Sequence, residues 1–260
     1  MEPIPPVPCD PARLFSILYC GVIALQTLIH YREQLQFFRT QPDRVYGQPP
    51  LLLGLVPLPT GNERLFMAAG GGFILALAAA AGGFAPRASP AAALACYLFY
   101  FPAILPHGYV MRKTNLIPIV LAIMIMAPGQ AIVLVRLSLS LVYLSAGVEK
   151  LLASGVRWAD GRNLQAYLLE HYLYTERPQA LWLARRARLC RWLSTGVLIW
   201  ELSFWLIMFF PALIPFYALV GLAVHAGTSV AMRIHYWVYF CPAYIVFATP
   251  WLCAWIASWT

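Results

Sequence analysis

Long apolar segments recur along the chain and are separated by short polar connections. A transmembrane helix needs about 20 mostly apolar residues, and on this basis we predict eight spans, at about 12–30, 64–82, 90–106, 115–127, 131–153, 193–210, 212–232 and 237–255. Asp10 before Pro11, and Asn62 followed by Glu63, are good helix starts because their side chains can cap the first turn. The pattern predicts an all-α polytopic bundle that forms a single domain over 1–260.

Two further segments are predicted to lie at the membrane surface. The apolar piece 51–59 is too short and too rich in proline to span, so we interpret it as interfacial or re-entrant. The segment 154–192 contains seven arginines against Asp160, Glu170 and Glu176. Its apolar residues keep helical spacing, which predicts two amphipathic helices in the interface, one with Leu164, Tyr167, Leu168 and Tyr172, the next with Leu181, Trp182, Leu189 and Trp192.

Composition agrees with a membrane protein and excludes several other classes. Hydrophobic residues make up 61% of the chain and charged residues 11%, against about 25% charged in a soluble domain. Cysteines at 9, 20, 96, 190, 241 and 253 form no metal-ligand spacing, so we predict no metal site and expect them to pack as small apolar residues. Nucleic-acid binding needs a soluble basic face, which the sequence does not indicate.

Basic residues outside the predicted spans are unevenly distributed. The amino-terminal tail and the loops after spans two, four and six hold Arg13 and Arg87, whereas the other loops hold fourteen Lys and Arg residues. Because such residues concentrate in cytoplasmic loops, we expect an integral protein, placed in a bacterial inner membrane, with its basic loops in the cytoplasm and both termini outside.

Ionisable residues within the spans mark a candidate site. The fifth predicted span presents Arg136, Ser140, Tyr143, Gly147 and Lys150 on one helical face, with Glu149 about 100° away. Glu201 and His225 lie in the middle of the sixth and seventh spans. A single buried His or Glu is more often structural, and Lys150 near a helix end could snorkel to the interface. Taken together, Lys150, Glu201, His225 and Arg136 favour a shared polar pocket.

The same region resembles a known membrane family. Tyr143, Ala146-Gly147-Val148, Lys150-Leu151, Trp158 and Gly161 are similar to the signature of the horizontally transferred transmembrane domain, which is related to the membrane domain of vitamin K-dependent gamma-glutamyl carboxylase. Asp10-Pro11-Ala12 and the late His225 also fall where the family has counterparts. Those carboxylases work on the lumenal side, so either the orientation differs here or the count of spans is off by one.

The resemblance implies roles for individual residues. The carboxylase lysine associated with deprotonating reduced vitamin K corresponds to Lys150, and a late-span histidine corresponds to His225. The chain departs from the family pattern because Glu149 replaces a paired lysine and 113–117 holds no histidine, with His107 out of register. The expectation that remains is a quinone, vitamin K-like quinol or lipid near Lys150, and not vitamin K-dependent carboxylation itself.

Two hypotheses follow from the sequence. The first is a membrane enzyme with Lys150 as base or cation, His225 as proton partner and Glu201 as its orienter, in a ligand site whose other residues are Arg136, Tyr143, Glu149, Trp158 and Arg233. The second is a non-catalytic integral subunit of an electron-transfer, photosynthetic or respiratory complex that contacts membrane lipids and protein partners. A base role needs desolvation or a nearby cation such as Arg136, whereas pairing with a carboxylate suits a fixed cation.

Overall fold

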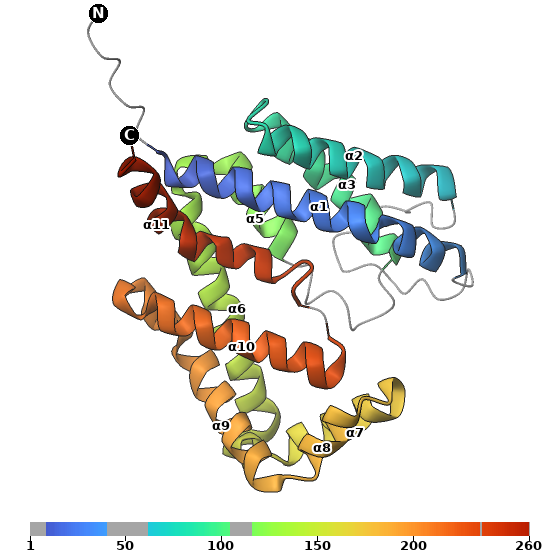
Figure 1. Ribbon diagram of the computed structural model, residues 1–260, viewed down its shortest axis with the longest axis vertical. Coiled ribbons are helices and arrows are strands. Elements are labelled where there is room, and N and C mark those ends of the chain that lie inside the picture. The colour runs from blue at the N-terminus through green and yellow to red at the C-terminus, as the bar shows by residue number, and fades with distance from the viewer. Residues whose placement is uncertain (1–8, 41–61, 105–115, 235, 260) are drawn as a thin grey trace, which may run out of the picture. The chain divides into compact units, whose positions relative to one another are not determined.

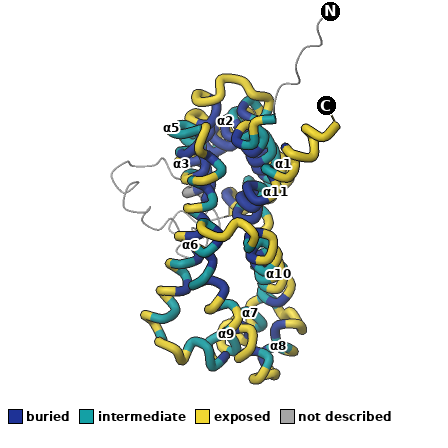
Figure 2. The backbone as a smooth tube through the Cα atoms, turned by 90° about the vertical axis from the view of Figure 1, so that its left-hand side faces the viewer, coloured by how far each residue is buried: buried dark blue, intermediate teal, exposed yellow. Residues whose placement is uncertain are grey.

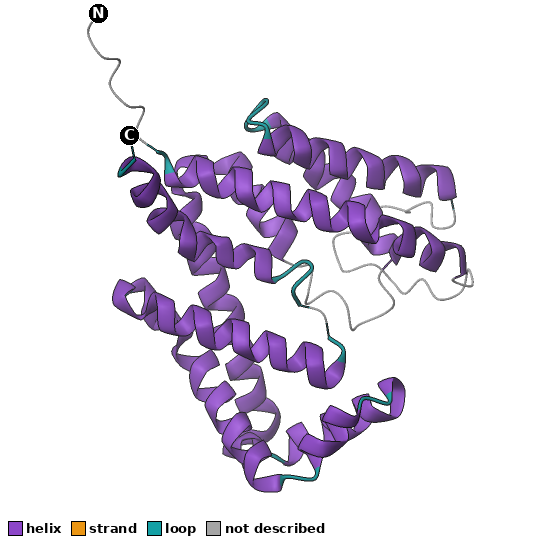
Figure 3. Ribbon diagram, viewed as in Figure 1, coloured by secondary structure: helices purple, strands orange, loops and turns teal. Residues whose placement is uncertain are grey.

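A computed structural model describes residues 9–40, 62–104, 116–234 and 236–259, and these residues form helices and no strand (Figure 1, Figure 3). They divide into two compact units, one of Met1–Val135 with Val238–Thr260 and one of Arg136–Trp237. The boundary lies within the fifth predicted span. The predicted interfacial piece 51–59 lies outside the described residues.

The first unit is built from the amino-terminal helices and the last helix. Its elements are α1 (Pro11–Thr40), α2 (Glu63–Ala81), α3 (Ala88–Ile104), α5 (Leu116–Met126), the 3₁₀ turns η1 (Pro128–Gln130) and η5 (Cys241–Tyr244), and α11 (Ile245–Ala257). Both predicted caps are confirmed. A side-chain oxygen of Asp10 accepts from Ala12 N at 2.9 Å, and the Asn62 side chain accepts from Leu65 N at 3.1 Å. Each cap satisfies an amide that the first helical turn leaves without a partner.

Small residues on α2 let α1 and α3 approach closely, as small residues commonly do between membrane helices. A Cβ on Gly70 would come within 2.6 Å of the rings of both Tyr31 on α1 and Tyr100 on α3. A Cβ on Gly72 would lie 2.9 Å from Cys96 Sγ on α3. Buried positions recur along α1, α2 and α3 (Figure 2). Several of them are aromatic, and Tyr100 stacks on Phe66 with ring centroids 4.9 Å apart.

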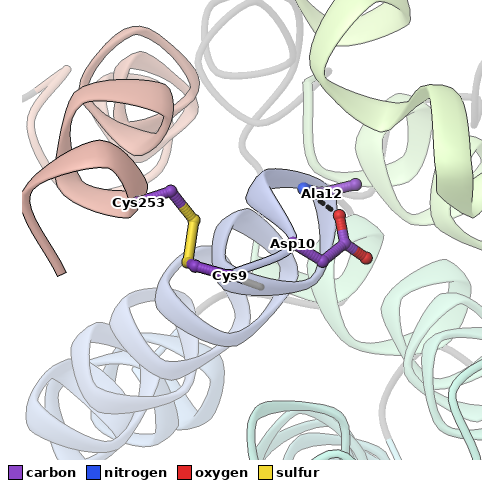
Figure 4. The surroundings of a disulfide bond; sticks show 4 residues. All are labelled: Cys9, Asp10, Ala12 and Cys253. Carbon is purple, nitrogen blue, oxygen red and sulfur yellow. Dashed lines mark hydrogen bonds between the residues drawn. A yellow bond between two sulfur atoms is a disulfide. The ribbon is translucent and has the colours of Figure 1, made fainter. Parts of the chain in front are cut away.

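A disulfide joins Cys9, just before α1, to Cys253 on α11, with the two Cα atoms 5.3 Å apart (Figure 4). The expectation that all six cysteines pack as apolar residues is therefore wrong for these two. Sequence spacing could not pair them, because 244 residues separate them and only the packing of α11 beside α1 brings them together. The other four cysteines are free thiols, and Cys20, Cys190 and Cys241 are buried.

The second unit contains the candidate site. From Arg136 onward it comprises α6 (Ala131–Ser154), η2 (Gly155–Asp160), α7 (Arg162–Thr175), α8 (Pro178–Ala184), α9 (Ala187–Ser203), η3 (Phe204–Met208), η4 (Pro211–Leu213) and α10 (Ile214–Met232). Trp200 Nε1 on α9 donates to Tyr217 O on α10 at 3.2 Å, and Tyr217 Oη donates to Ser203 Oγ at 2.8 Å. These bonds hold α9 against α10.

Four helical stretches among the described residues are long and apolar enough to cross a membrane: Pro11–Thr40, Glu63–Ala81, Pro128–Asp160 and Pro211–Met232. This is the pattern of a helical membrane protein, but the predicted count of eight spans is not confirmed. The fourth predicted span is an 11-residue helix, α5, and the eighth begins with turns, because its helical residues start at Cys241. At about 1.5 Å per residue, α5 covers about 16 Å, roughly half of a bilayer core.

The basic segment differs in detail from the prediction. Helices α7 and α8 have 14 and 7 residues and are too short to span, in agreement with a surface position. The second predicted amphipathic helix is divided, because α8 ends at Ala184 and Leu189 and Trp192 belong to α9. The chain turns at Arg185, whose N–H closes α8 by donating to Leu181 O at 3.1 Å.

Candidate functional site

Lys150 and Glu201 form an ion pair between α6 and α9. Lys150 Nζ donates to both carboxylate oxygens of Glu201. The side chain of Glu201 is 9% exposed and that of Lys150 is 22% exposed, so the pair is largely removed from the surface of the unit. A buried charge is tolerated when it is paired in this way. The ion pair therefore accounts for two of the charges that the sequence places within apolar helices, Lys150 and Glu201.

Gly147 allows this pair to form. It lies on the same face of α6, one turn before Lys150, and a Cβ there would come within 2.9 Å of Leu202 Cδ2 and 3.2 Å of Glu201 Cβ. A larger residue would move α9 away from α6. The absence of a side chain at Gly147 thus sets the helix separation that the ion pair needs.

Tyr143 and His225 form a second polar contact, two turns along α6 from Lys150. Tyr143 Oη lies 2.7 Å from His225 Nε2 on α10, and the two residues are 4% and 6% exposed. Aromatic rings surround the contact: Trp200 and Phe204 lie 4.4 Å and 4.5 Å from the Tyr143 ring, and Tyr236 lies 4.8 Å from the His225 ring, between centroids. This is a buried hydrogen-bonding pair packed among aromatic rings.

Trp158 and Gly161 have structural roles around Lys150. The Trp158 ring lies below the ammonium group, with its centroid 5.6 Å from Lys150 Nζ, a distance at which a cation and an aromatic face attract each other. Gly161 has φ +86°, and a Cβ there would come within 2.5 Å of Arg191 N. The loop after α6 can therefore lie against the start of α9 only with glycine at this position.

The remaining predicted site residues are Arg136, Glu149 and Arg233. At about 1.5 Å per residue, Arg136 lies about 21 Å along the α6 axis from Lys150, so it cannot act as the nearby cation that a lysine base requires. Glu149 is exposed on α6 beside the ion pair. Arg233 is the C-cap of α10, exposed, with φ +57°. The structure thus brings Lys150 together with Glu201 and Trp158.

Glu201 contacts Lys150, and the group that the structure places at His225 Nε2 is the hydroxyl of Tyr143. Sequence reasoning included Tyr143 only as a ligand residue, and it missed the aromatic rings of Trp200, Phe204 and Tyr236 that pack against this pair. Trp200 was detectable, because it adjoins Glu201. Tyr236 was not, because it follows the end of α10 and returns to His225 only by folding back.

The arrangement separates two chemical capacities. The pairing of Lys150 with Glu201 suits a fixed cation, since the ammonium would lose its attraction for the carboxylate on giving up a proton. The Tyr143 hydroxyl and the His225 ring can each donate or accept a hydrogen bond, so this pair can exchange a proton with a polar ligand group. Over the residues that the structure describes, no group of three or more His, Cys, Asp or Glu side chains could hold a metal ion.

Comparisons with known proteins add no family to this description. No protein-family model matches the chain, and neither the curated proteins nor the solved structures include a match.

Proposed function

We propose that this helical membrane protein binds a quinone, a quinol or a lipid of similar polarity at the Tyr143–His225 pair. The observation that supports the proposal is the 2.7 Å contact between Tyr143 Oη and His225 Nε2, which is packed among aromatic side chains. A quinone combines a flat apolar ring with carbonyl oxygens. Aromatic side chains suit the ring, and hydroxyl and imidazole groups suit the oxygens.

Lys150 and Glu201 position this site in the proposal. Their ion pair joins α6 to α9, and α9 in turn carries Trp200 next to the Tyr143 ring. Lys150 is a fixed cation at one end of the site, and His225 is the group that accepts or supplies a proton. The proposal includes no step in which Lys150 acts as a base.

Purification in mild detergent followed by solvent extraction and mass spectrometry tests the proposal directly. We expect about one quinone or quinol per chain in the wild-type protein, and reduced occupancy in Tyr143→Phe and His225→Phe at equal yield of folded protein. Tyr217→Phe is the matched control, because its hydroxyl bonds Ser203 within the same unit. Equal occupancy in all four proteins, or none in the wild type, contradicts the proposal.

A second candidate is a non-catalytic integral subunit. The observation that favours it is that several residues of the family-like signature have packing roles: Gly147 and Gly161 permit close approach, and Trp158 contacts the paired Lys150. Under this alternative the protein purifies with stoichiometric protein partners and without a small ligand. The same purification distinguishes the two candidates when the extracted lipids and the co-purifying protein bands are both analysed.

We further propose that the Cys9 end of the first unit faces the oxidising side of the membrane, with the basic loops in the cytoplasm of a bacterial inner membrane. Disulfides persist in the periplasm and are rare in the cytosol, and Cys9 is bonded to Cys253. The uneven count of Lys and Arg independently supports this orientation. We expect Gln179→Cys, on the exposed part of α8, to react with a membrane-impermeant maleimide in inverted vesicles only. Labelling in intact cells alone reverses the assignment.

A further inference from the structure

A pocket of about 650 Å³ opens on the surface of the second unit, where α7 ends and α8 begins. Its walls combine two arginines, one carboxylate and apolar side chains, contributed by Tyr172, Glu176, Pro178, Leu181, Trp182, Arg185 and Arg186. Its volume is within the range of small-ligand sites, about 300 to 1,000 Å³. None of these residues belongs to the Tyr143–His225 or Lys150–Glu201 contacts.

One of the two arginines in the pocket wall, Arg186, is held in a defined position. The Arg186 guanidinium stacks on the Trp182 ring, with Cζ 3.7 Å from the ring centroid, and its Nη1 donates to Trp182 O at 2.7 Å. A guanidinium carries five N–H donors in a planar fork. Stacking and one backbone bond fix its plane while leaving further N–H groups able to bind two oxygens of one ligand group, as arginine does with phosphate.

The elements around the pocket are also anchored. Leu168, Ala180, Ala184 and Cys190 form a buried cluster with Ala231, so α7 and α8 pack on the ends of α9 and α10. Gln165 Nε2 on α7 donates to Ala184 O at the end of α8 at 2.7 Å. The pocket is therefore formed by a braced pair of short helices.

We propose that this pocket binds the phosphate-bearing headgroup of an anionic phospholipid. Arg185 and Arg186 outnumber Glu176 in the walls, and the surrounding segment 154–192 has seven arginines against three acidic residues. Helices α7 and α8 are too short to cross the bilayer, so they suit the headgroup layer. Trp182, 53% exposed beside the pocket, presents an aromatic surface of the kind found at that depth.

A lipid explains the walls better than free phosphate does. Free phosphate needs only the arginines, whereas the walls also carry Leu181, Pro178, Tyr172 and Trp182, which suit the glycerol and the first acyl carbons. The inference depends on the membrane location of the protein and not on a ligand at His225. Loss of the headgroup site and loss of the quinone site can therefore be observed separately.

Native mass spectrometry of the full chain released from detergent micelles tests the site, using dioctanoyl phosphatidylglycerol and dioctanoyl phosphatidylcholine as probes. We expect phosphatidylglycerol to bind at least tenfold more tightly. Arg185→Gln and Arg186→Gln should each weaken it about fivefold, the effect of one basic residue near an anionic surface. Glu176→Gln should strengthen it, because that change removes the carboxylate from the walls.

Arg188→Gln is the matched control, since Arg188 is an exposed arginine two residues after Arg186 but not in the walls. It should change affinity less than twofold. Arg186→Lys keeps the charge without the planar fork, so it covers the case in which Arg186→Gln fails to fold, and we expect intermediate affinity. Equal weakening by Arg188→Gln and Arg186→Gln, or equal binding of the two lipids, overturns the proposal. Inorganic phosphate that competes with the lipid at equal concentration reassigns the site to free phosphate and also overturns it.

Discussion

Replacing Lys150 by methionine should destabilise the protein strongly. The change keeps most of the side-chain length and removes the cation from Glu201, whose side chain is 9% exposed. Breaking a buried ion pair by removing one partner costs about 3 to 5 kcal/mol, because the other charge stays buried without compensation. We expect a loss near the lower limit, about 3 kcal/mol, since the Lys150 side chain is itself 22% exposed and water can reach part of the pair.

A double-mutant cycle separates the pair from its surroundings. Glu201→Gln keeps the shape of the side chain and removes its charge. The variant with both Lys150→Met and Glu201→Gln should then lose at least about 1 kcal/mol less stability than the sum of the single losses, as contacting residues do. Glu149→Gln is the matched control, because it removes the neighbouring exposed carboxylate, and it should change stability by less than about 0.5 kcal/mol.

The measurement is unfolding in mixed micelles, with circular dichroism followed as sodium dodecyl sulfate is added. The two single variants each lose some free energy of unfolding. If the sum of these losses equals the loss in the double variant within about 0.5 kcal/mol, Lys150 and Glu201 are not coupled. Lys150→Arg extends the test to function, because a guanidinium remains charged and cannot serve as a base. A fixed cation predicts that Lys150→Arg keeps both stability and extractable ligand. If Lys150→Arg has normal stability but no longer turns over the bound ligand, the base hypothesis is restored.

Three further predictions concern glycine positions and the disulfide. Gly161→Ala should lower the free energy of unfolding by about 2 kcal/mol or more in the same assay, because the residue has φ +86° and its Cβ would meet the backbone of α9. Gly196 has open space around it, so the control Gly196→Ala should be neutral or stabilising. Gly70→Leu should lower the melting temperature far more than Gly71→Leu, because only Gly70 faces two tyrosine rings; equal effects would contradict the packing of α2. Cys9→Ser should lower stability by about 2 to 4 kcal/mol, and dithiothreitol should lower wild-type stability to the same level while leaving the variant unchanged.

Much of the helical layout could be predicted from the sequence, because its causes are local. Asp10 and Asn62 cap helices through contacts with residues two or three positions away. The helical period places Tyr143, Gly147 and Lys150 on one face of α6, and the structure uses that face for contacts with α9 and α10. Composition likewise predicts that the arginine-rich segment does not cross the bilayer, since so many charges in one crossing helix would be too costly.

Other features depend on tertiary structure because they join residues that no local rule connects. The partner of Lys150 could be Glu149 or Glu201 by sequence, and only the approach of α9 at Gly147 selects Glu201. The eight predicted spans rest on apolar length alone, whereas only four helical stretches of the described residues are long and apolar enough to cross a membrane. Likewise, Cys9 and Cys253 are 244 residues apart, and composition gave no reason to pair them. Local periodicity determines which face of a helix is polar, but the neighbouring helix determines which charge, ring or thiol that face meets.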